Sequence, residues 1–433
     1  MEFEVIMPTQ KEVLMILLFF LSFRHPFLIL VFFASLLYNA LYSIEDGVKG
    51  LLLIAIRTIL NPSLAINIDS VQLYKWVVIF VLCFIILLHS RHIVLPRHTH
   101  VFVFLEVMFC IYICAISVCN SSYPLVSIFK CFSYGFVFLS VVIGISGSIE
   151  YVDWSNILYQ YIGRLMFFSV LMVPTSMAYY SSAHWFMGAT NQSQMFGIMA
   201  ALYSSLALIQ MMRGNRSLYQ YIMLIAITAL TFLSGSRTGM LATVICLTYG
   251  YYVEVFKNKK IVILIISVAV IGIVFVWFAE PVKDLLKNFI LKDAFNNNNV
   301  AISVDAITAS RKGQYEMFMQ KFNNNKWIGS GFMVPYVPGT QTWLFSFGLI
   351  VESGNIFYSI LGDLGIVGLI LFLCVYGYML CIGEKRNGRI ILFLAPFLVS
   401  MGEMIFFSTN NNAIILYAML AIFMCEKTLN DEL

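Results

Sequence analysis

The stretch VFVFLEVMFCIYICAISVC, residues 101–119, is a nearly unbroken apolar run of the length that crosses a membrane. A helix needs about 20 such residues to span the hydrocarbon core of a bilayer. Similar runs recur along the whole chain, in which 61% of the 433 residues are hydrophobic and only 11% are charged. A soluble fold of this size cannot bury so much apolar surface. The sequence therefore predicts an all-α polytopic membrane protein.

The apolar runs predict about twelve transmembrane helices within one integral membrane domain, residues 1–433. They lie at 27–43, 72–90, 101–119, 125–147, 161–180, 194–212, 218–234, 239–256, 261–279, 355–381, 390–408 and 412–425. The first is the least certain, because apolar sequence begins near Val13 and is interrupted by RHP at 24–26. A helical hairpin there would make thirteen spans and would place the N-terminus on the other side.

Basic residues gather in alternate short loops. Loops on one side carry Arg91, Arg97, Arg213, Arg216, Lys257, Lys259, Lys260, Lys385, Arg386 and Arg389. The intervening short loops at 120–124, 181–193 and 409–411 carry no Lys or Arg. By the positive-inside rule the basic side is cytoplasmic, and both termini then lie in the cytoplasm. Lys130 and Arg164, near helix ends, are expected to reach up to the membrane surface.

Two longer segments are predicted on the outer side. Residues 44–71 include a short amphipathic piece, LLLIAIRTIL, and residues 280–347 form a long loop between the ninth and tenth spans. A loop of that length inside a compact domain is usually functional. Within it, aromatic and apolar residues of SRKGQYEMFMQKF recur on one helical face. We therefore expect a short helix around 310–322 on the outer membrane surface.

Arg237 is a basic residue on the side where the other short loops have none. It lies in FLSGSRTGML, a tight turn between two spans, with Gly235 and Gly239 on either side. Glycine lets the backbone approach a ligand closely, and a guanidinium can hold a phosphate through two parallel hydrogen bonds. Two interpretations stay open at this point: a phosphate-binding residue, and an anchor whose guanidinium reaches the membrane surface.

Arg311 opens the helix-like stretch of the long loop, and WIGSGFMVP follows that stretch. The backbone N–H groups near Gly329 and Gly331 are placed to face an anion if the chain bends there. The alternative is that Arg311 is a solvated surface charge.

The stretch VESGNIFYSILGDLGIVGLILF, residues 351–372, joins the long loop to a late span. Glu352 lies at its mouth, where it can accept a proton or remain a solvated loop acid. Asp363 lies about 12 Å below Asn355 at 1.5 Å per residue, well inside the bilayer. An acid at that depth should be paired or face a polar cavity. A ridge of small residues suited to close helix packing follows the same stretch, formed by Gly362, Gly365 and Gly368.

His184 and Asn191 precede a span within SSAHWFMGATNQSQMFG. His184 is the histidine that the span assignment places on the outer side, and a lone histidine is not a metal site. Zinc and DxD-type signatures are absent, and the nine cysteines include no CxxC pair. The outer chemistry is therefore expected to need no metal, and no cofactor is indicated.

Four of these pieces, in this order and on the predicted outer side, resemble the O-antigen polymerase and ligase superfamily of membrane glycosyltransferases. They are GATNQSQ, SGSRTG, SRKGQYEMFMQKF with WIGSGF, and GNIFYSILGDLGIVG, spread over about residues 185–372. The resemblance implies a C-type membrane glycosyltransferase-like fold in the inner (plasma) membrane of a bacterium. It implies a donor glycan carried on undecaprenyl diphosphate, a second glycolipid as acceptor, and contact with membrane lipid but not nucleic acid. A chain-length regulator protein is a further partner that the family implies.

The resemblance also suggests roles for the candidate residues. Arg237 and Arg311 match the family's diphosphate holders, and two guanidiniums can stabilise charge growing on a leaving diphosphate without a metal. Asn191, His184 and Asn355 are candidate substrate-binding residues of the same outer face.

The choice between polymerase and ligase depends on one position. The ligase branch typically carries a histidine directly before the Asn of the late-span motif, and this chain has Gly354 there, with no histidine anywhere in 280–354. Glu352 is then the nearest group able to accept a proton, and it is the candidate catalytic residue. The sequence therefore favours a repeat-unit polymerase of the Wzy type over a ligase. A flippase or other transporter is the third alternative, and it would call for ionisable residues in the middle of several spans.

Overall fold

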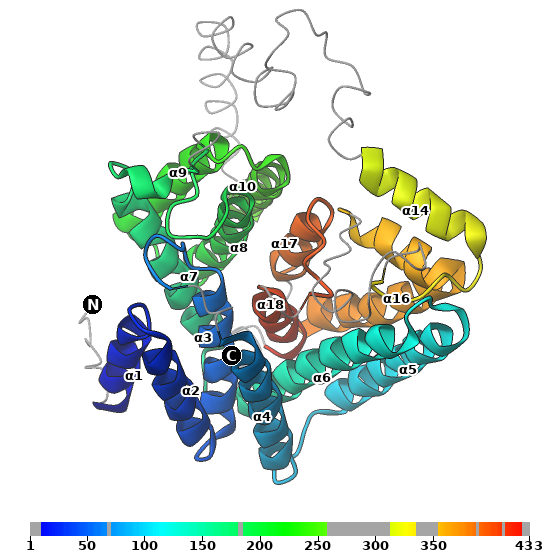
Figure 1. The fold of residues 1–433 in the computed structure, drawn as a ribbon. Coiled ribbons are helices and arrows are strands. Elements are labelled where there is room, and N and C mark those ends of the chain that lie inside the picture. The colour runs from blue at the N-terminus through cyan, green and yellow to red at the C-terminus, as the bar shows by residue number, and fades with distance from the viewer. Residues whose placement is uncertain are drawn as a thin grey trace, which may run out of the picture.

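The computed structural model describes residues 10–66, 71–180, 185–257, 312–334, 354–386, 389–408 and 412–426. Within these ranges the chain is helical, and its β-pairing is limited to two isolated bridges, Leu60 with Thr190 and Tyr179 with Phe186. Figure 1 shows the helices: α1 (Gln10–Leu21), α2 (Pro26–Ala40), α3 (Ile44–Thr58), α4 (Gln72–Ser90), α5 (Arg97–Asn120), α6 (Pro124–Ser148), α7 (Trp154–Leu171), the 3₁₀ turn η2 (Ser176–Ala178), α8 (Ser193–Met212), α9 (Leu218–Leu233), α10 (Arg237–Lys257), α14 (Lys312–Asn324), α16 (Ile356–Arg386), α17 (Ile391–Ser400) and α18 (Ala413–Cys425).

Five of the helices in these ranges are long and apolar enough to cross a membrane, namely α4, α5, α6, α8 and α16. Shorter apolar helices are α2, α9, α17 and α18. Each predicted span that falls in the described ranges overlaps a helix, so the all-helical, polytopic membrane architecture is confirmed. The number of twelve stays a prediction, because the span expected at 261–279 lies outside the described residues.

Several serine and threonine hydroxyls inside these helices are satisfied within their own helix. Ser204 donates to the carbonyl of Ala200 (2.8 Å), and Thr231 donates to that of Ile227 (2.7 Å). A hydroxyl bonded to the carbonyl one turn earlier leaves no unpaired donor in hydrocarbon. This is why the apolar helices can carry many serines and threonines without needing partners on other helices.

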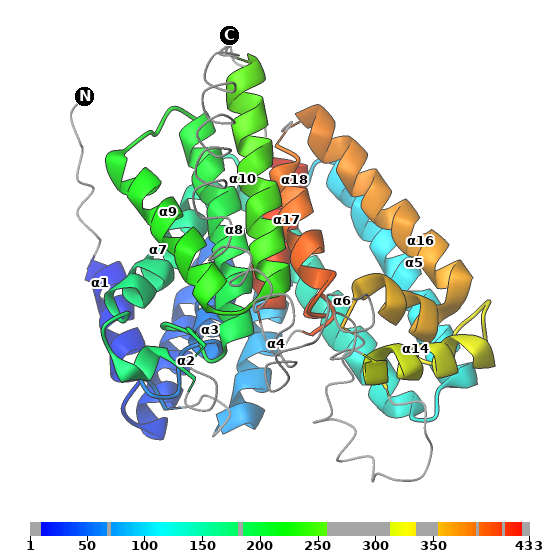
Figure 2. The same cartoon turned by 90° about the horizontal axis from the view of Figure 1, so that it is seen from above.

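The bundle has two chemically different ends, and Figure 2 shows the helices that run between them. At one end, which we call the basic end, Arg213 pairs with Asp153 and Glu426, and Arg389 also pairs with Glu426. At the opposite end, the loop end, Asn61 N donates to Ala189 O (2.8 Å) and Asn120 Nδ2 donates to Gly329 O (3.0 Å). The gathering of Arg213 and Arg389 at one end agrees with the segregation of basic loops; that this end faces the cytoplasm stays a prediction.

The N-terminal region differs from the expectation of one span at 27–43. Helices α1 and α2 form an antiparallel hairpin around the RHP turn, in which Met15 Sδ accepts a hydrogen bond from Asn39 Nδ2 (2.9 Å) and the rings of Phe19 and Phe32 lie 5.7 Å apart. The hairpin that the sequence left open is therefore the one observed.

Residues 44–71 are also placed differently, because helix α3 crosses the bundle instead of lying outside it. Its first turns pack beside the last turns of α4, where Gly47 faces Ile86, and its end reaches the loop end near Ala189. Three alternating helices therefore bring the start of α1 to the basic end, where Glu426 also lies. The prediction of an outer segment was wrong because Arg57 makes LLLIAIRTIL look amphipathic. In the structure the Arg57 guanidinium is buried and donates to the carbonyls of Ser22 and Ile66.

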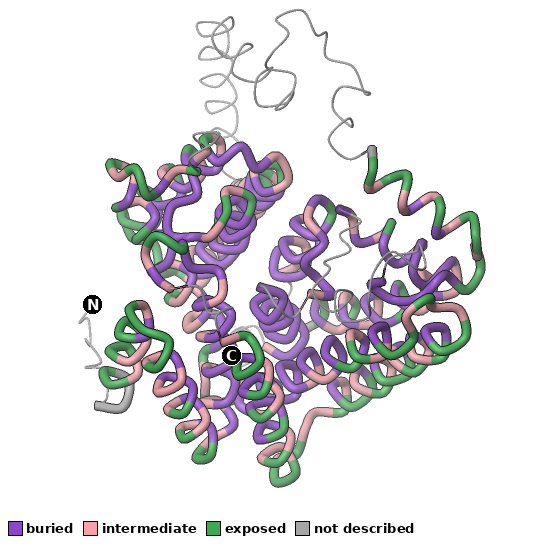
Figure 3. The backbone as a smooth tube through the Cα atoms, viewed as in Figure 1, coloured by how far each residue is buried: buried purple, intermediate pink, exposed green. Residues whose placement is uncertain are grey.

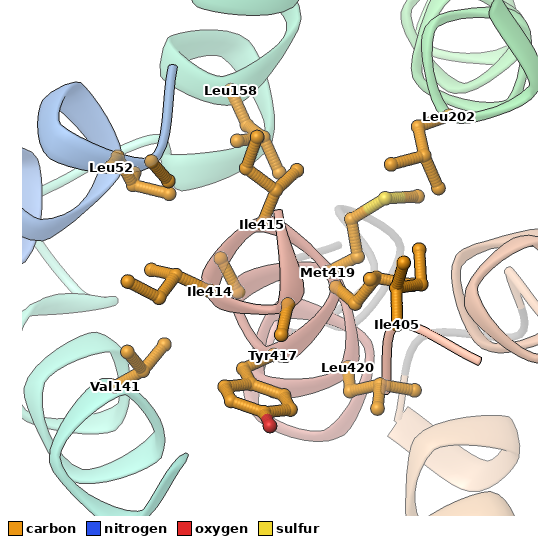
Figure 4. Close-up of a cluster of buried hydrophobic side chains, with 14 of the residues drawn as sticks. Leu52, Val141, Leu158, Leu202, Ile405, Ile414, Ile415, Tyr417, Met419 and Leu420 are labelled. Atoms are coloured by element: carbon orange, nitrogen blue, oxygen red, sulfur yellow. The ribbon is translucent and has the colours of Figure 1, made fainter. Parts of the chain in front are cut away.

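Helix α18 lies at the centre of the bundle. All of its 13 residues are buried, and Figure 3 shows the continuous burial of this segment. Figure 4 shows Ile414, Ile415 and Met419 of α18 surrounded by side chains of other helices, among them Leu52, Val141, Leu158 and Leu202, and by Ile405 of the segment 401–408. A helix that is apolar on every side must be enclosed by other helices, and α18 is.

The described part of the long loop contains the expected short helix. Helix α14 covers nearly all of the predicted range 310–322. Its Phe318 ring stacks on Tyr358 of α16 with centroids 4.8 Å apart, and Phe318 is buried. One face of α14 therefore packs on α16, while Tyr315 remains about half exposed.

Candidate active site at the loop end

Helix α16 is broken at Gly365, which has φ +69° and ψ −169°. Such a backbone conformation is open to glycine and costly for other residues. A Cβ at this position would also collide with the backbone of Trp327. Gly365, a member of the predicted glycine ridge, is thus the position at which α16 is interrupted and at which the backbone of Trp327 comes into contact with the helix.

The backbone groups freed by the break are satisfied by the turn that follows α14. Ile366 N donates to Lys326 O (3.0 Å), and Val367 N donates to Trp327 O (3.1 Å). In the other direction, Gly331 N donates to Asp363 O (3.0 Å), and the hydroxyl of Tyr112 donates to Leu364 O (2.9 Å). An interrupted helix at membrane depth is tolerated only with such replacements.

This arrangement corrects the expectation for Gly329 and Gly331. Gly329 N donates to Asn325 O (2.9 Å), Ser330 N to Gly362 O (3.3 Å) and Gly331 N to Asp363 O. These N–H groups are occupied by carbonyls of the chain and do not face an anion. The glycines are needed for a different reason, because both have positive φ and a Cβ at Gly329 would collide with the backbone of Asp363.

Asp363 is paired, as the sequence predicted, and it lies beside Gly329 at the loop end. Its Oδ1 lies 2.5 Å from Lys321 Nζ, and both side chains are only 5% exposed. Its Oδ2 accepts hydrogen bonds from Met333 N (2.8 Å) and from Ser359 Oγ (3.3 Å). The prediction that this acid is paired is confirmed, and its contacts connect α14, the turn at 329–334 and α16.

Lys130 does not reach for the membrane surface as expected. It lies on α6, and its Nζ donates to Met333 O (2.6 Å). The turn at 329–334 lies against this part of α6, where Ser127 Oγ accepts from Phe332 N (2.8 Å). The lysine is therefore directed at the protein and not at lipid head groups.

Arg237 is the first residue of α10 and is half-buried at the loop end. The turn before it is tight: Gly235 has φ +63° and lies under the ring of Trp185, and Ser234 Oγ accepts from Ser236 N (3.3 Å). The side chain thus projects from a helix N-terminus, where the helix dipole adds to its attraction for an anion.

Close packing fixes that helix N-terminus. Gly239 of α10 lies against Gly197 of α8 so closely that a Cβ on Gly239 would collide with the backbone of Gly197. Contacts between small residues of this kind let two helices approach at short distance in a membrane. Arg237 is therefore held on a rigid pair of helices.

Asn191 precedes α8 in the segment that covers the turn before Arg237. Its backbone N–H donates to Ile59 O (2.8 Å), and its Oδ1 is buried without a hydrogen-bond partner. In the same segment Phe186 N donates to Leu233 O (3.2 Å). A buried acceptor without a donor is costly, so the Asn191 amide is a group that a ligand hydroxyl could satisfy.

Asn355 caps α16 and ties it to the end of α17. Its Oδ1 accepts from Phe357 N (2.9 Å), and its Nδ2 donates to Met401 O (3.0 Å). Both ends of the amide are thus engaged within the protein. Its role in substrate binding stays a prediction, and the contacts seen are those of a helix cap.

The segment 401–408 brings Arg237 and Asn355 to the same region. Gly402 lies directly against the side chain of Thr238, the neighbour of Arg237, and Met401 accepts the hydrogen bond from Asn355. Further along, the ring of Phe407 packs against Phe332 with centroids 5.1 Å apart. Arg237, Asn355 and the turn at 329–334 therefore border one region of the loop end.

Three predicted site residues lie outside the described residues: Glu352, Arg311 and His184. Within the described ranges, no group of three or more His, Cys, Asp or Glu side chains is arranged to hold a metal ion. The sequence reasoning did not find Lys321 or Met333 as members of the site. A signal existed for Lys321, which is a basic residue one turn from Phe318 on α14 and so can meet the acid that needed a partner.

The fold and this region define a polytopic helical membrane protein in which most of the irregular backbone lies at one end, among the described residues. The sequence model of a family described as O-antigen ligase matches residues 221–373. That match covers about a third of the chain and supports the resemblance of this part to the O-antigen polymerase and ligase superfamily, whose members are glycosyltransferase-like enzymes. The matched range includes Arg237, Arg311, Glu352 and Asn355. Searches of curated proteins and of solved structures give no match to the chain.

Proposed function

We propose that this protein polymerises lipid-linked oligosaccharide repeat units by glycosyl transfer at the outer face of a bacterial inner membrane. The donor is a glycan on undecaprenyl diphosphate, and the acceptor is another lipid-linked unit. In this reaction an acceptor hydroxyl attacks the anomeric carbon, the bond to the diphosphate breaks, and a base takes the hydroxyl proton. Both termini then face the cytoplasm, and a chain-length regulator is a partner suited to such an enzyme.

The observation that carries this proposal is the position of Arg237. It opens α10 at the loop end, within the range that matches the family, and it borders the same region as Asn355. A fixed guanidinium at a helix N-terminus stabilises negative charge developing on a leaving diphosphate, and it needs no reorganisation during the reaction. Arg311 would supply a second cation and Glu352 the base.

Polymerisation is favoured over ligation by the residue before Asn355. Gly354 is buried and has φ +66°, a conformation that costs about 1–2 kcal/mol for a residue with a side chain. A histidine is therefore disfavoured here by the backbone as well as being absent from the sequence. The description of the matched family as O-antigen ligase keeps ligation as the second candidate.

A deletion strain complemented with variants tests the proposal. We expect Arg237→Ala to leave the protein in the membrane but to yield glycans of a single repeat unit on a ladder gel, because the diphosphate is no longer held. Arg237→Lys keeps the charge without the bidentate geometry and should give a weak ladder. Arg216→Ala, which removes an arginine near the basic end, is the matched control and should give a normal ladder.

The gel also separates the two candidates. A strain that lacks a ligase accumulates long polymer on the carrier lipid, whereas a strain that lacks a polymerase shows single units. Long carrier-linked polymer in the deletion strain would show that the protein is a ligase, and a normal ladder from Arg237→Ala would remove the diphosphate assignment.

A further inference from the structure

Met333 has an unusual backbone conformation for a residue with a side chain. Its φ is +56°, and among the described residues it is the one non-glycine residue with positive φ. A left-handed conformation costs about 1–2 kcal/mol in such a residue and persists only where the surroundings enforce it. Since the side chain is 5% exposed, the residue is not simply a loose surface turn.

Both backbone polar groups of Met333 are held by ionisable side chains from different helices. Its N–H donates to Asp363 Oδ2 on α16 (2.8 Å), and its carbonyl accepts from Lys130 Nζ on α6 (2.6 Å). Hydrogen bonds to charged groups are about twice as strong as neutral ones, so two of them can offset the conformational cost. The third member, Lys321, fixes the other oxygen of Asp363.

The residues next to Met333 connect this group of Lys130, Asp363 and Lys321, which we call the clamp, to the candidate site. Phe332 is buried, and its ring packs edge-on against Phe407. Phe407 belongs to the segment 401–408, whose Met401 holds Asn355 and whose Gly402 lies against Thr238 beside Arg237. A shift of Met333 would therefore move Phe332 and, through Phe407, the surface on which Arg237 and Asn355 are placed.

We propose that Lys130 and Asp363 are positioning residues, which hold Met333 in its left-handed conformation and so set the position of the segment 401–408 relative to Arg237. This inference rests on the proposed function for the reaction that it affects. The two residues act through backbone and need not touch substrate. A polar pair is required here because apolar side chains of α6 and α16 cannot form hydrogen bonds to the N–H and carbonyl of Met333.

The first test compares variants that remove one contact at a time. Membranes from the complemented deletion strain are supplied with lipid-linked repeat units extracted from that strain, and initial rates are measured over a dilution series. We expect Lys130→Met and Asp363→Asn to lower kcat by about tenfold to 100-fold, as small misplacements of reacting groups do, with KM changed much less. Lys130→Arg, which keeps a donor, should retain most of the rate.

The second test is a rescue that a direct chemical role would not show. Glycine adopts the left-handed conformation freely and asparagine tolerates it, so Met333→Gly or Met333→Asn should need the clamp less. Combined with Lys130→Met, either substitution should recover several-fold of the lost rate. If neither substitution restores any rate while the double variants still accumulate in the membrane, the positioning role is overturned.

The third test does not depend on the reaction. Hydrogen exchange of a peptide covering 329–334 should be faster in Lys130→Met than in the wild type. Without the hydrogen bond from Lys130 to the Met333 carbonyl, the turn is held less firmly and its backbone N–H groups open more often. Unchanged exchange together with lost activity would contradict the proposal and give these residues a direct role. If the wild type itself makes no polymer, the proposed function fails, whereas the exchange comparison still decides whether the clamp exists.

Discussion

Two clusters of buried charge lie at opposite ends of the bundle and differ in what they hold. At the loop end, Asp363 forms an ion pair with Lys321 and accepts a hydrogen bond from Met333 N, while Lys130 donates to Met333 O. One acid and two lysines therefore surround a segment of irregular backbone. At the basic end, Arg213 and Arg389 meet Asp153 and Glu426, so two cations face two anions between regular helix ends.

Exposure separates the two clusters further. Lys321 and Asp363 are each 5% exposed. At the basic end the side chains of Arg213, Arg389 and Glu426 are 11% or 12% exposed, and that of Asp153 is 52% exposed. A partly solvated pair is screened and contributes little to stability, while breaking a buried pair leaves an uncompensated charge. The comparison indicates that the loop-end cluster fixes a conformation needed for activity and that the basic-end cluster mainly joins helices.

The largest effect is expected at Asp363. Asp363→Leu removes the partner of Lys321 and the acceptor of Met333 N, and leaving a buried charge unpaired costs about 3–5 kcal/mol. We expect a clearly lower Tm of the purified protein and no polymer on the ladder gel. The double variant Asp363→Leu with Lys321→Met should regain Tm but not polymer, since Met333 is still released. A double variant with a normal ladder would remove the distinction drawn between the two ends.

A smaller loss of stability is expected from Gly365→Ala, a substitution at the break in α16. The left-handed φ costs about 1–2 kcal/mol for alanine, and the new Cβ adds a collision with the backbone of Trp327. Thermal melts should show a lower Tm, together with reduced polymer. Gly377→Ala on the same helix is the control: a Cβ there meets nothing within 4 Å, and a helical glycine replaced by alanine gains up to about 1 kcal/mol. Equal melting temperatures for the two variants would show that the break is not enforced.

Glu426→Gln is expected to affect stability without affecting the product. The amide oxygen can accept from one of the two arginines, whereas the NH2 group replaces the oxygen that accepts from the other. The two guanidinium charges are also no longer balanced, so the loss of stability is about 1–2 kcal/mol. Ladder gels of this variant should match the wild type. Single-unit glycans from a normally inserted Glu426→Gln protein would place the basic end in the reaction and contradict the comparison.

The smallest effect concerns pH at the basic end. Burial raises the pKa of Asp153, but hydrogen bonds from Arg213 and from Asn156 N outweigh it, so the net pKa lies below its usual value. Burial raises the pKa of Glu426, and the two arginines only partly oppose this. The lowered acid contributes stability that is present above its unfolded pKa of about 3.9 and lost as pH falls through its folded value. The raised acid acts in the opposite direction, since the folded state binds its proton more tightly.

These opposing contributions predict a Tm that changes little between about pH 7 and 5 and falls only near or below about pH 4. Asp153→Asn should flatten the fall at low pH, measured as Tm against pH in the same detergent. A steep loss of stability already at pH 6 in the wild type would show that other groups dominate.

The sequence was sufficient for the features set by local composition. Apolar runs located most of the helices, and the depth of Asp363 required a partner. The partner itself could not be predicted, because Lys321 lies 42 residues earlier and meets Asp363 only through the break in α16. Contacts formed only in the fold also explain the error at Gly329 and Gly331. The Gly331 N–H donates to Asp363 of α16, and the Gly329 N–H donates to the carbonyl of Asn325.

The N-terminal error has a different cause. Residues 44–71 were predicted on the outer side with the amphipathic piece LLLIAIRTIL, which contains Arg57. The start of α3 also carries the ionisable residues Glu45, Asp46 and Lys49. In the structure the acids lie in the first turn after the Ser43 cap, where helix dipoles favour them, and Arg57 is enclosed by carbonyls. A 15-residue helix with charges at both ends can still cross the bundle. The average hydropathy of such a segment is lowered by the charged ends, so it does not indicate a crossing helix.

The central position of α18 has a consequence for the order in which the bundle can be completed. The ribosome makes α3, α6, α7, α8, α16 and α17 before α18, yet all of them supply or border the space that α18 fills. The earlier helices must therefore wait in the membrane in a looser association, since an empty core would leave their inner faces without packing partners. Completion of the loop-end site, which rests on the neighbouring segment 401–408, is then tied to a helix that is synthesised after all of the helices that enclose it.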